Sequence, residues 1–263
     1  MTSDRSDATV FVDADNTLWD TDQVFAGAQL TMLAETELAL ELKAPPQDRL
    51  AFVRAIDQAI AARHHAGLRY PPRLLVRALS HALQGYGSEA AARAAWSGNI
   101  PAPLAGEAEA EIEMHFFTAV RQPPKLRSGV LDGLSQLQDA GATVLIVSES
   151  ASAKVEASAA TLGLAGYFTR VIEGQKRPEL YHRVVRLTGS STRAYMIGDQ
   201  LDRDIAPAKQ AGLTTIYFPG GFVPRWTPDE AKIDPDFRVS DFAEAAAIIL
   251  SGRRSQKVRA LGA

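Results

Sequence analysis

Short apolar runs that stop abruptly at polar residues are the clearest pattern in the chain. The first covers residues 9–12, where β-branched and aromatic residues are followed at once by Asp13 and then by Asp15. A run this short indicates a buried parallel strand, because an amphipathic helix would need a longer stretch with a 3.6-residue period. Ligands bind beyond the carboxyl ends of such strands, so both acids are candidates for chemistry. Acids also form turns, and this run alone leaves an acidic surface turn open.

Strand-like and helix-like segments alternate after about residue 125. Such alternation predicts a parallel sheet, because neighbouring parallel strands need a crossover connection. The first strand must join the same sheet, which gives an α/β fold with a Rossmann-like core. The expected strands cover residues 143–147, 168–172, 194–197, 214–218 and 237–239, and the expected helices lie near residues 130–140, 153–162, 179–187 and 205–211.

The stretch between the first strand and this alternating part has a different pattern. Apolar residues recur there at helical spacing, as in Val24, Ala28 and Met32, and proline pairs separate the segments. Amphipathic helices have this period. The expected domains are a Rossmann-like core at residues 1–19 and 123–263, an inserted all-helical module at residues 20–122, and a flexible basic tail at residues 252–263.

Composition narrows the class of protein. The chain has 263 residues, of which 46% are hydrophobic and 22% charged, as in ordinary soluble globules. Its formal net charge of −3 argues against a nucleic-acid binder with a strongly positive face. No apolar stretch approaches the roughly 20 residues that cross a bilayer, and the first residues lack the apolar region of a signal peptide, so we expect no membrane association and a cytoplasmic location. The absence of cysteine excludes disulfides, thiolate metal sites and a cysteine nucleophile.

Polar residues also follow two later strands. Ser148 ends the second expected strand, and Asp199 follows the fourth, with Asp204 five residues later. Lys176 lies between them in the chain. An acid pair, a hydroxyl, a lysine and a Gly-Asp pair with a further acid, in this order, resembles the haloacid dehalogenase superfamily along nearly the whole chain. The resemblance implies a hydrolase with a helical cap inserted directly after the first strand of its core.

The resemblance assigns catalytic roles to four residues. Asp13 would attack phosphorus and form an aspartyl-phosphate intermediate, which divides hydrolysis into two easier steps. Asp15 would protonate the leaving alcohol and then deprotonate water. Ser148 would hydrogen-bond the transferring phosphoryl group, and Lys176 would hold both Asp13 and the phosphate oxygens. The lysine position varies among relatives, and Arg177 competes with Lys176 for this role.

The resemblance also implies a metal site. Asp13, Asp199 and the backbone carbonyl of Asp15 would bind Mg²⁺, with Asp204 as a further ligand or as a support behind the ligands. Acids gathered in one crevice repel one another unless cations balance them, and oxygen ligands favour Mg²⁺ over zinc or copper. We therefore expect a Mg²⁺-dependent phosphatase whose partner is a small-molecule phosphate ester.

Residues beside these motifs have plainer expected roles. The Thr17 hydroxyl is expected to secure the turn, and Asp202 is expected to be a solvated acid. Ser148, Ser150 or Ser152 can cap the next helix. Asn16 stands where most relatives have glycine, and asparagine tolerates a left-handed backbone there. Glu149 stands where small or amide residues are usual, and either points away or alters the leaving-group pocket.

Two further groups are candidate readers of the substrate. Trp226, in a long loop after a late strand, either borders the crevice or packs, and packing is the expectation. The other group lies near a helix end, where it forms either a polar reader of the leaving group or a solvated basic helix end. Its members are Arg63, His64, His65, Arg69 and Tyr70.

Two other functions share parts of the pattern. A haloacid dehalogenase has the same fold and aspartate nucleophile but acts without magnesium, and such enzymes generally lack an acid at the position of Asp15. A response-regulator receiver also gathers acids, a hydroxyl and a lysine at strand ends to accept a phosphoryl group. Receivers are much shorter, and the long insertion after the first strand disfavours one. Asp15 and the long insertion after the first strand together favour the phosphatase.

Overall fold

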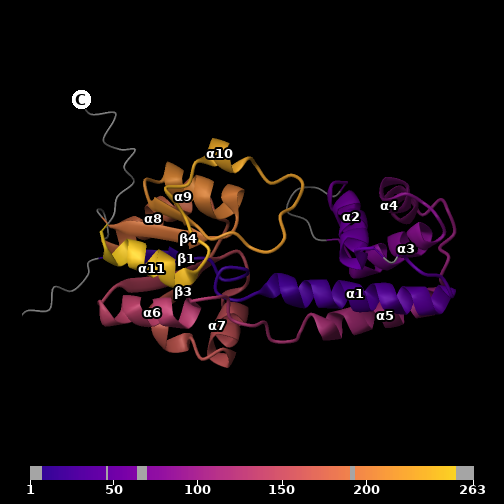
Figure 1. The fold of residues 1–263 in the computed structure, drawn as a ribbon, viewed down its shortest axis with the longest axis horizontal. Coiled ribbons are helices and arrows are strands. Elements are labelled where there is room, and N and C mark those ends of the chain that lie inside the picture. Colours follow the sequence, from indigo (N-terminus) through magenta and orange to yellow (C-terminus); the bar gives the residue numbers. More distant parts are fainter. Residues whose placement is uncertain (1–7, 46, 64–69, 190–192, 253–263) are drawn as a thin grey trace, which may run out of the picture. The chain divides into compact units, whose positions relative to one another are not determined.

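The computed structural model describes residues 8–45, 47–63, 70–189 and 193–252. The chain divides into two compact units, one formed by Met1–Asp22 with Pro123–Ala263 and the other by Gln23–Gln122. Figure 1 shows the elements of each unit. The expected tail beyond residue 252 lies outside the described residues, as do His64, His65 and Arg69 of the basic group.

The first unit is built on a six-stranded sheet with the order β3-β2-β1-β4-β5-β6, and every neighbouring pair in it is parallel. β1 lies in the middle and pairs with β2 and β4, so the carboxyl ends of these three strands lie at one edge. This arrangement confirms the predicted α/β, Rossmann-like core. The strands are β1 (Thr9–Val12), β2 (Thr143–Ser148), β3 (Arg170–Glu173), β4 (Ala194–Gly198), β5 (Thr214–Tyr217) and β6 (Phe237–Arg238).

Helices cover both faces of this sheet (Figure 1). Side chains of β1 alternate between the faces, so Val10 and Val12 join one buried cluster and Phe11 joins the other. The first cluster is completed by α6 (Val130–Asp139), α7 (Ser152–Thr161) and α11 (Phe242–Leu250), and the second by α8 (Pro178–Thr188) and α9 (Ala206–Gln210).

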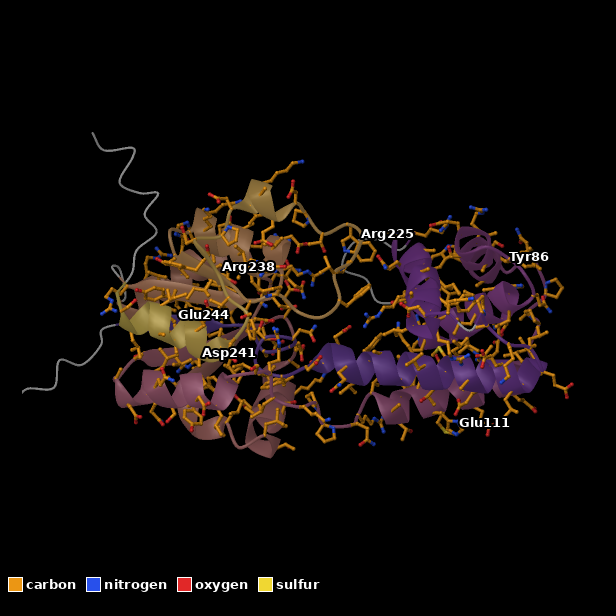
Figure 2. All side chains as sticks on the ribbon, viewed as in Figure 1. Tyr86, Glu111, Arg225, Arg238, Asp241 and Glu244 are labelled. Carbon is orange, nitrogen blue, oxygen red and sulfur yellow. The ribbon has the colours of Figure 1, made fainter. Side chains whose placement is uncertain are left out.

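Several elements were not predicted, and α11 is the largest of them. Its residues are almost all apolar, so they lack the polar positions that reveal a helical period. Asp241 begins the helix by accepting a hydrogen bond from the Ala243 N–H at 2.8 Å, and Figure 2 shows Asp241 and Glu244 at its first turn. The others are short: η1, a 3₁₀ turn at Ala165–Tyr167; η2, a π-helical turn at Leu201–Ile205; and α10 (Glu230–Ile233).

The second unit, in its described residues, consists of helices around their own core. Buried side chains such as Met32, Ile56, Leu79 and Phe116 form this core without a contribution from the sheet. None of the described helices combines the length and the hydrophobicity that a bilayer crossing requires. The helices are α1 (Thr21–Leu40), α2 (Arg49–Ala61), α3 (Pro72–Leu83), α4 (Ser88–Ser97) and α5 (Gly106–Ala119).

Candidate active site

The turn after β1 is held in one shape by its own backbone. The Asp13 N–H donates to the Ile197 carbonyl at 3.0 Å, which extends the pairing of β1 with β4. Leu18 N–H donates to the Ala14 carbonyl at 2.9 Å and closes the turn. Asn16 has a φ of +59°, the left-handed region that asparagine tolerates. The two acids of the turn therefore leave the sheet edge in fixed directions.

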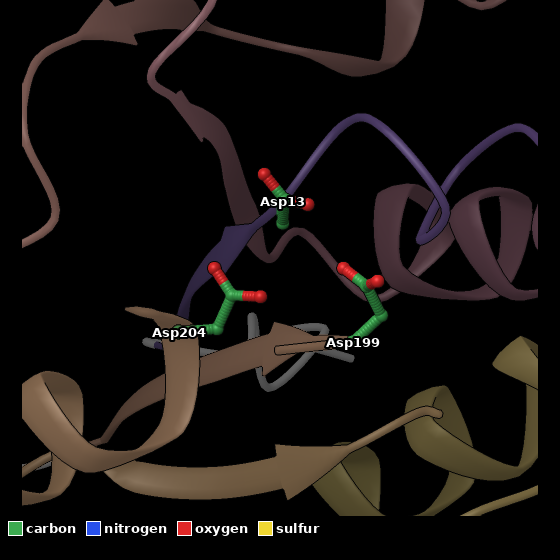
Figure 3. Close-up of side chains that lie close together, drawn as sticks. All are labelled: Asp13, Asp199 and Asp204. Carbon is green, nitrogen blue, oxygen red and sulfur yellow. The ribbon is translucent and has the colours of Figure 1, made fainter. Parts of the chain in front are cut away.

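Three carboxylates converge at this edge. One oxygen each from Asp13, Asp199 and Asp204 lies within 4.8 Å of the others, and Figure 3 shows the three side chains close together. Asp199 follows β4, whereas Asp204 comes from the π-helical turn η2 and is fully buried. The Thr17 hydroxyl donates to Asp199 Oδ1 at 3.4 Å, so it links the turn after β1 to an acid of the cluster. Asp202 is exposed.

Lys176 joins this acidic cluster from the loop before α8. Its Nζ donates to Asp13 Oδ1 and, at 2.6 Å, to Asp204 Oδ1, and its side chain is only 6% exposed. Burial alone would lower the pKa of Lys176, but the charges of Asp13 and Asp204 outweigh burial and raise this pKa. Lys176 is therefore a fixed cation in the site, while Arg177 is exposed at the start of α8.

The acids carry more negative charge than Lys176 balances. Burial raises the pKa of Asp13 to about 7; Lys176 opposes this rise, and the charge of Asp204 adds to it. Burial, with the charges of Asp13 and Asp204, raises the pKa of Asp199 well above its usual range. Buried, mutually repelling carboxylate oxygens are suited to a hard divalent cation, which would relieve the repulsion. The residues Asp13, Asp199 and Asp204 therefore fit a metal such as Mg²⁺.

The Asp15 carboxylate lies outside this cluster. Its Oδ1 accepts hydrogen bonds from Trp19 Nε1 at 3.0 Å and the Thr21 hydroxyl at 2.8 Å, and its Oδ2 accepts one from the Ser150 hydroxyl at 3.1 Å. A role of Asp15 at the metal is thus left to its backbone carbonyl. The three donors were not found from the sequence, although Trp19 and Thr21 follow Asp15 closely in the same turn.

The loop after β2 contacts the two segments that carry Lys176 and Asp204. Ser148 is buried, and its Oγ accepts from the Ser150 N–H at 3.1 Å. Glu149 Oε1 accepts from the Lys176 backbone N–H at 3.2 Å, and its Oε2 pairs with Arg203 Nη1 at 2.6 Å. Glu149 therefore links the loop that carries Lys176 to the turn that carries Asp204. Ser150 does not cap α7: the residue at the N-cap is Ala151, and the Glu173 carboxylate accepts from the Ser152 N–H at 2.8 Å.

A family model described as a haloacid dehalogenase-like hydrolase matches residues 8–212. This chain belongs to the haloacid dehalogenase-like hydrolases. The matched part begins at β1 and includes every residue of the acidic cluster, together with Ser148 and Lys176. A search among curated proteins finds no match to this hydrolase.

Solved structures share the fold of this hydrolase along nearly its whole length. A haloacid dehalogenase-like family hydrolase from Xanthomonas campestris is 20% identical, with a TM-score of 0.57 and coverage of 94% of this chain and 96% of that one. YfnB of Bacillus subtilis, assigned as an HAD hydrolase and solved with magnesium, is 20% identical with a TM-score of 0.60 and coverage of 92% and 98%. A predicted phosphoglycolate phosphatase from Haemophilus somnus is 15% identical with a TM-score of 0.57 and coverage of 94% and 99%. At these identities the likeness shows the fold.

A cavity of about 280 Å³ adjoins the acidic cluster of this hydrolase on the side of Asp199. Asn16, Arg203, Gly220 and Trp226 are among the residues that line it. Trp226 is 53% exposed, so the expectation that it packs is wrong. The loop after β5 gives the site an aromatic wall that the sequence motifs did not include.

Proposed function

We propose that this hydrolase is a Mg²⁺-dependent phosphatase that releases phosphate from a small phosphorylated metabolite through an aspartyl-phosphate on Asp13. The observation that carries the proposal is the Asp15 carboxylate, held two residues past Asp13 by the Trp19, Thr21 and Ser150 donors. Loss of an alcohol from phosphorus needs a proton, whereas loss of halide from carbon does not. A secured acid beside the nucleophile therefore supports phosphate chemistry over dehalogenation.

In the first half of the proposed reaction, an Asp13 oxygen attacks phosphorus and the bond from phosphorus to the leaving oxygen breaks, while Asp15 gives that oxygen its proton. In the second half, Asp15 takes a proton from water as the water oxygen attacks phosphorus, and the bond from phosphorus to Asp13 breaks. Lys176 keeps a positive charge beside Asp13 throughout. A Mg²⁺ ion held by Asp13, Asp199 and Asp204 would supply positive charge opposite the phosphoryl oxygens.

Two of the similar structures support this substrate class by name. One is the predicted phosphoglycolate phosphatase of Haemophilus somnus, and the other, from Thermotoga maritima, is assigned as a β-phosphoglucomutase, with 14% identity and a TM-score of 0.59 over 93% of this chain and 99% of that one. YfnB, with its magnesium, supports the metal. We further propose that the helical unit Gln23–Gln122 is the cap that selects the leaving group.

The test is a panel of sugar phosphates, nucleoside monophosphates and phosphorylated carboxylic acids, assayed for phosphate release with Mg²⁺ and with chelator. We expect release that depends on Mg²⁺ and is abolished by Asp13→Asn, a change that preserves the shape of the side chain. Equal activity in parent and variant would exclude Asp13 as the nucleophile. Halide release from a 2-haloacid in chelator would favour the dehalogenase, and a phosphorylated chain that persists without turnover would favour a receiver-like role.

A further inference from the structure

Arg127 lies between Pro123, where the chain re-enters the first unit, and α6. Its guanidinium contacts three backbone carbonyls: Nη1 donates to those of Asn16 and, at 3.1 Å, Phe218, and Nη2 donates to that of Pro219 at 2.7 Å. The guanidinium carbon also lies 3.5 Å from the centre of the Phe218 ring. Arg127 thus joins the turn after β1, the catalytic turn that carries Asp13 and Asp15, to the loop that follows β5.

The two joined segments enclose Asp199. Asn16 directly follows Asp15 in the catalytic turn, and Pro219 directly precedes Gly220. A Cβ on Gly220 would lie 3.0 Å from Asp199 Oδ2 and 3.4 Å from the Asn16 Cβ, so Gly220 is packed against both residues. The opposite oxygen of Asp199 accepts the Thr17 hydroxyl. A shift of the Pro219 carbonyl would therefore reach Asp199 through Gly220.

A guanidinium suits this position better than an ammonium group. Its planar fork directs several N–H donors at once, so it can meet carbonyls from two different segments, and its face can stack on an aromatic ring. A lysine would keep the charge but reach fewer of the three carbonyls. Arg127→Lys therefore keeps the positive charge but weakens the bridge between the two segments.

We propose that Arg127 is a positioning residue of the active site, which fixes Asp199 by tying the Asn16 and Pro219 carbonyls together and thereby sets the affinity of the three-carboxylate cluster for Mg²⁺. Magnesium demands near-ideal octahedral geometry, so a small displacement of one ligand weakens its binding. This role of Arg127 rests on the proposed function only in assuming that the three carboxylates bind Mg²⁺. It does not depend on which substrate is hydrolysed.

The test measures Mg²⁺ binding to the full-length protein by calorimetry, together with hydrolysis of p-nitrophenyl phosphate. We expect Arg127→Lys to raise the Kd for Mg²⁺ by about 10- to 100-fold, the usual effect of removing a group that orients a metal ligand. At saturating Mg²⁺ its KM for the ester should stay within about twofold of the parent, because Lys176 and Ser148 are untouched. The matched control is Arg170→Lys on the edge strand β3, which should bind Mg²⁺ as the parent does.

Gly220→Ala provides the second variant, because its new methyl group presses on Asp199 while Arg127 stays in place. We expect the same loss of Mg²⁺ affinity, with thermal unfolding showing that both variants are folded. Parental Mg²⁺ affinity in a folded Arg127→Lys, or in Gly220→Ala if the lysine variant does not fold, overturns the proposal. A parent that binds Mg²⁺ but hydrolyses no phosphate ester would instead overturn the proposed function alone.

Discussion

Gly198 leaves the space in which the Asp204 side chain lies. A Cβ on Gly198 would fall 2.3 Å from the Asp204 Cβ and 2.4 Å from its Cγ, which is closer than real atoms approach. Because Gly198 has no side chain, the Asp204 side chain can pack against the end of β4. There it accepts hydrogen bonds from the Gln200 N–H at 2.9 Å and from Lys176 at 2.6 Å. The two residues at the end of β4 therefore have separate roles. Asp199 provides one acid of the cluster, and Gly198 leaves room for Asp204.

Gly198→Ala should displace Asp204 and weaken its contact with Lys176. Overpacking a filled interior costs about 1 to 3 kcal/mol, so we expect a loss of stability of this size together with a fall in phosphate release. Urea denaturation and the phosphate assay measure the two effects. Gly166→Ala is the matched control, because nothing lies within 4 Å of its new methyl group. If Gly198→Ala matched this control in both assays, Asp204 would not depend on the space at Gly198.

Much of the fold follows from local patterns. The strands are short apolar runs bounded by polar residues, and a buried parallel strand can hardly look otherwise. The polar residues that end β1, β2 and β4 are visible in the sequence, and parallel pairing then brings those ends to one edge. Asp13 and Asp199 meet for this reason, although they are far apart in the chain.

The parts that sequence patterns did not predict depend on contacts between distant segments. Arg127 reaches Asn16 across 111 positions, and the Ser150 hydroxyl reaches Asp15 across 135. Nothing in the neighbourhood of either residue marks it, because an arginine or a serine in a loop is usually solvated. The π-helical turn that carries Asp204 is likewise fixed by its packing against β4 and not by a repeating pattern.

Asp15→Asn should remove the proton donor but keep the oxygen that accepts from Trp19 and Thr21. Its amide nitrogen cannot accept from the Ser150 hydroxyl and would donate to it instead. General acid-base groups contribute about 10²- to 10⁴-fold, and we expect kcat for an alkyl phosphate to fall in this range. With p-nitrophenyl phosphate, whose leaving group needs no proton, formation of the phosphorylated enzyme should be spared and its hydrolysis slowed. Rapid-quench experiments should then show a burst of nitrophenolate, and its absence would contradict the assignment.

Ser150→Ala removes one of the three donors to Asp15 and leaves the acid in place. A hydrogen bond contributes about 0.5 to 1.5 kcal/mol net, and two donors remain, so we expect kcat to fall by about 2- to 10-fold. The matched control is Ser152→Ala, because Ser152 contacts Glu173 through its backbone N–H. Equal kcat in the two serine variants would show that the Ser150 contact does not serve Asp15.

In the helical unit, Arg49→Met should cost more stability than Glu37→Gln. The Glu37 side chain is 2% exposed and accepts two hydrogen bonds from Arg49, at 2.7 and 2.9 Å, and one from the Ala44 N–H at 2.8 Å. Losing Arg49 removes two hydrogen bonds from a buried carboxylate and leaves it the exposed Lys43 ammonium, 3.7 Å away, as a cation, at a cost of about 2 to 3 kcal/mol. Glu37→Gln removes the negative charge but leaves Arg49 partly exposed to water, so we expect a loss of stability of about 1 kcal/mol. Urea denaturation at pH 7 compares the two, and the reverse order would contradict the argument.

Tyr181→Phe should stabilise the first unit. The Tyr181 ring is fully buried against Phe11, with ring centres 6.5 Å apart, and its hydroxyl has no hydrogen-bond partner among the described residues. A buried polar group without a partner costs about 1 to 3 kcal/mol, so we expect a gain of about 1 kcal/mol in the free energy of unfolding. Tyr181→Leu, which also removes the ring, should instead be destabilising. A less stable phenylalanine variant would reveal a partner for the hydroxyl.

Asp57 should make the helical unit less stable as the pH rises. Burial raises the pKa of Asp57 from 3.8 to about 6, and the hydrogen bond from Gln29 Nε2 at 3.1 Å and the charge of Arg54 only partly oppose this rise. The folded state therefore holds the Asp57 proton more tightly than the unfolded state does. Stability from this group is complete below about pH 4 and is lost as the pH rises through about 6, a change of about two pKa units or about 3 kcal/mol.

Asp57→Asn tests this pH dependence because an amide cannot ionise. Urea denaturation of parent and variant between pH 4.5 and 7 should give free energies of unfolding whose difference grows in favour of the variant as the pH rises. Contributions from other carboxylates, including Asp13 and Asp199, are common to both proteins and cancel in that difference. Parallel profiles would mean that Asp57 keeps its charge when folded, which would require Gln29, Arg54 and the Tyr70 hydroxyl, which also donates to Asp57, to compensate its burial fully.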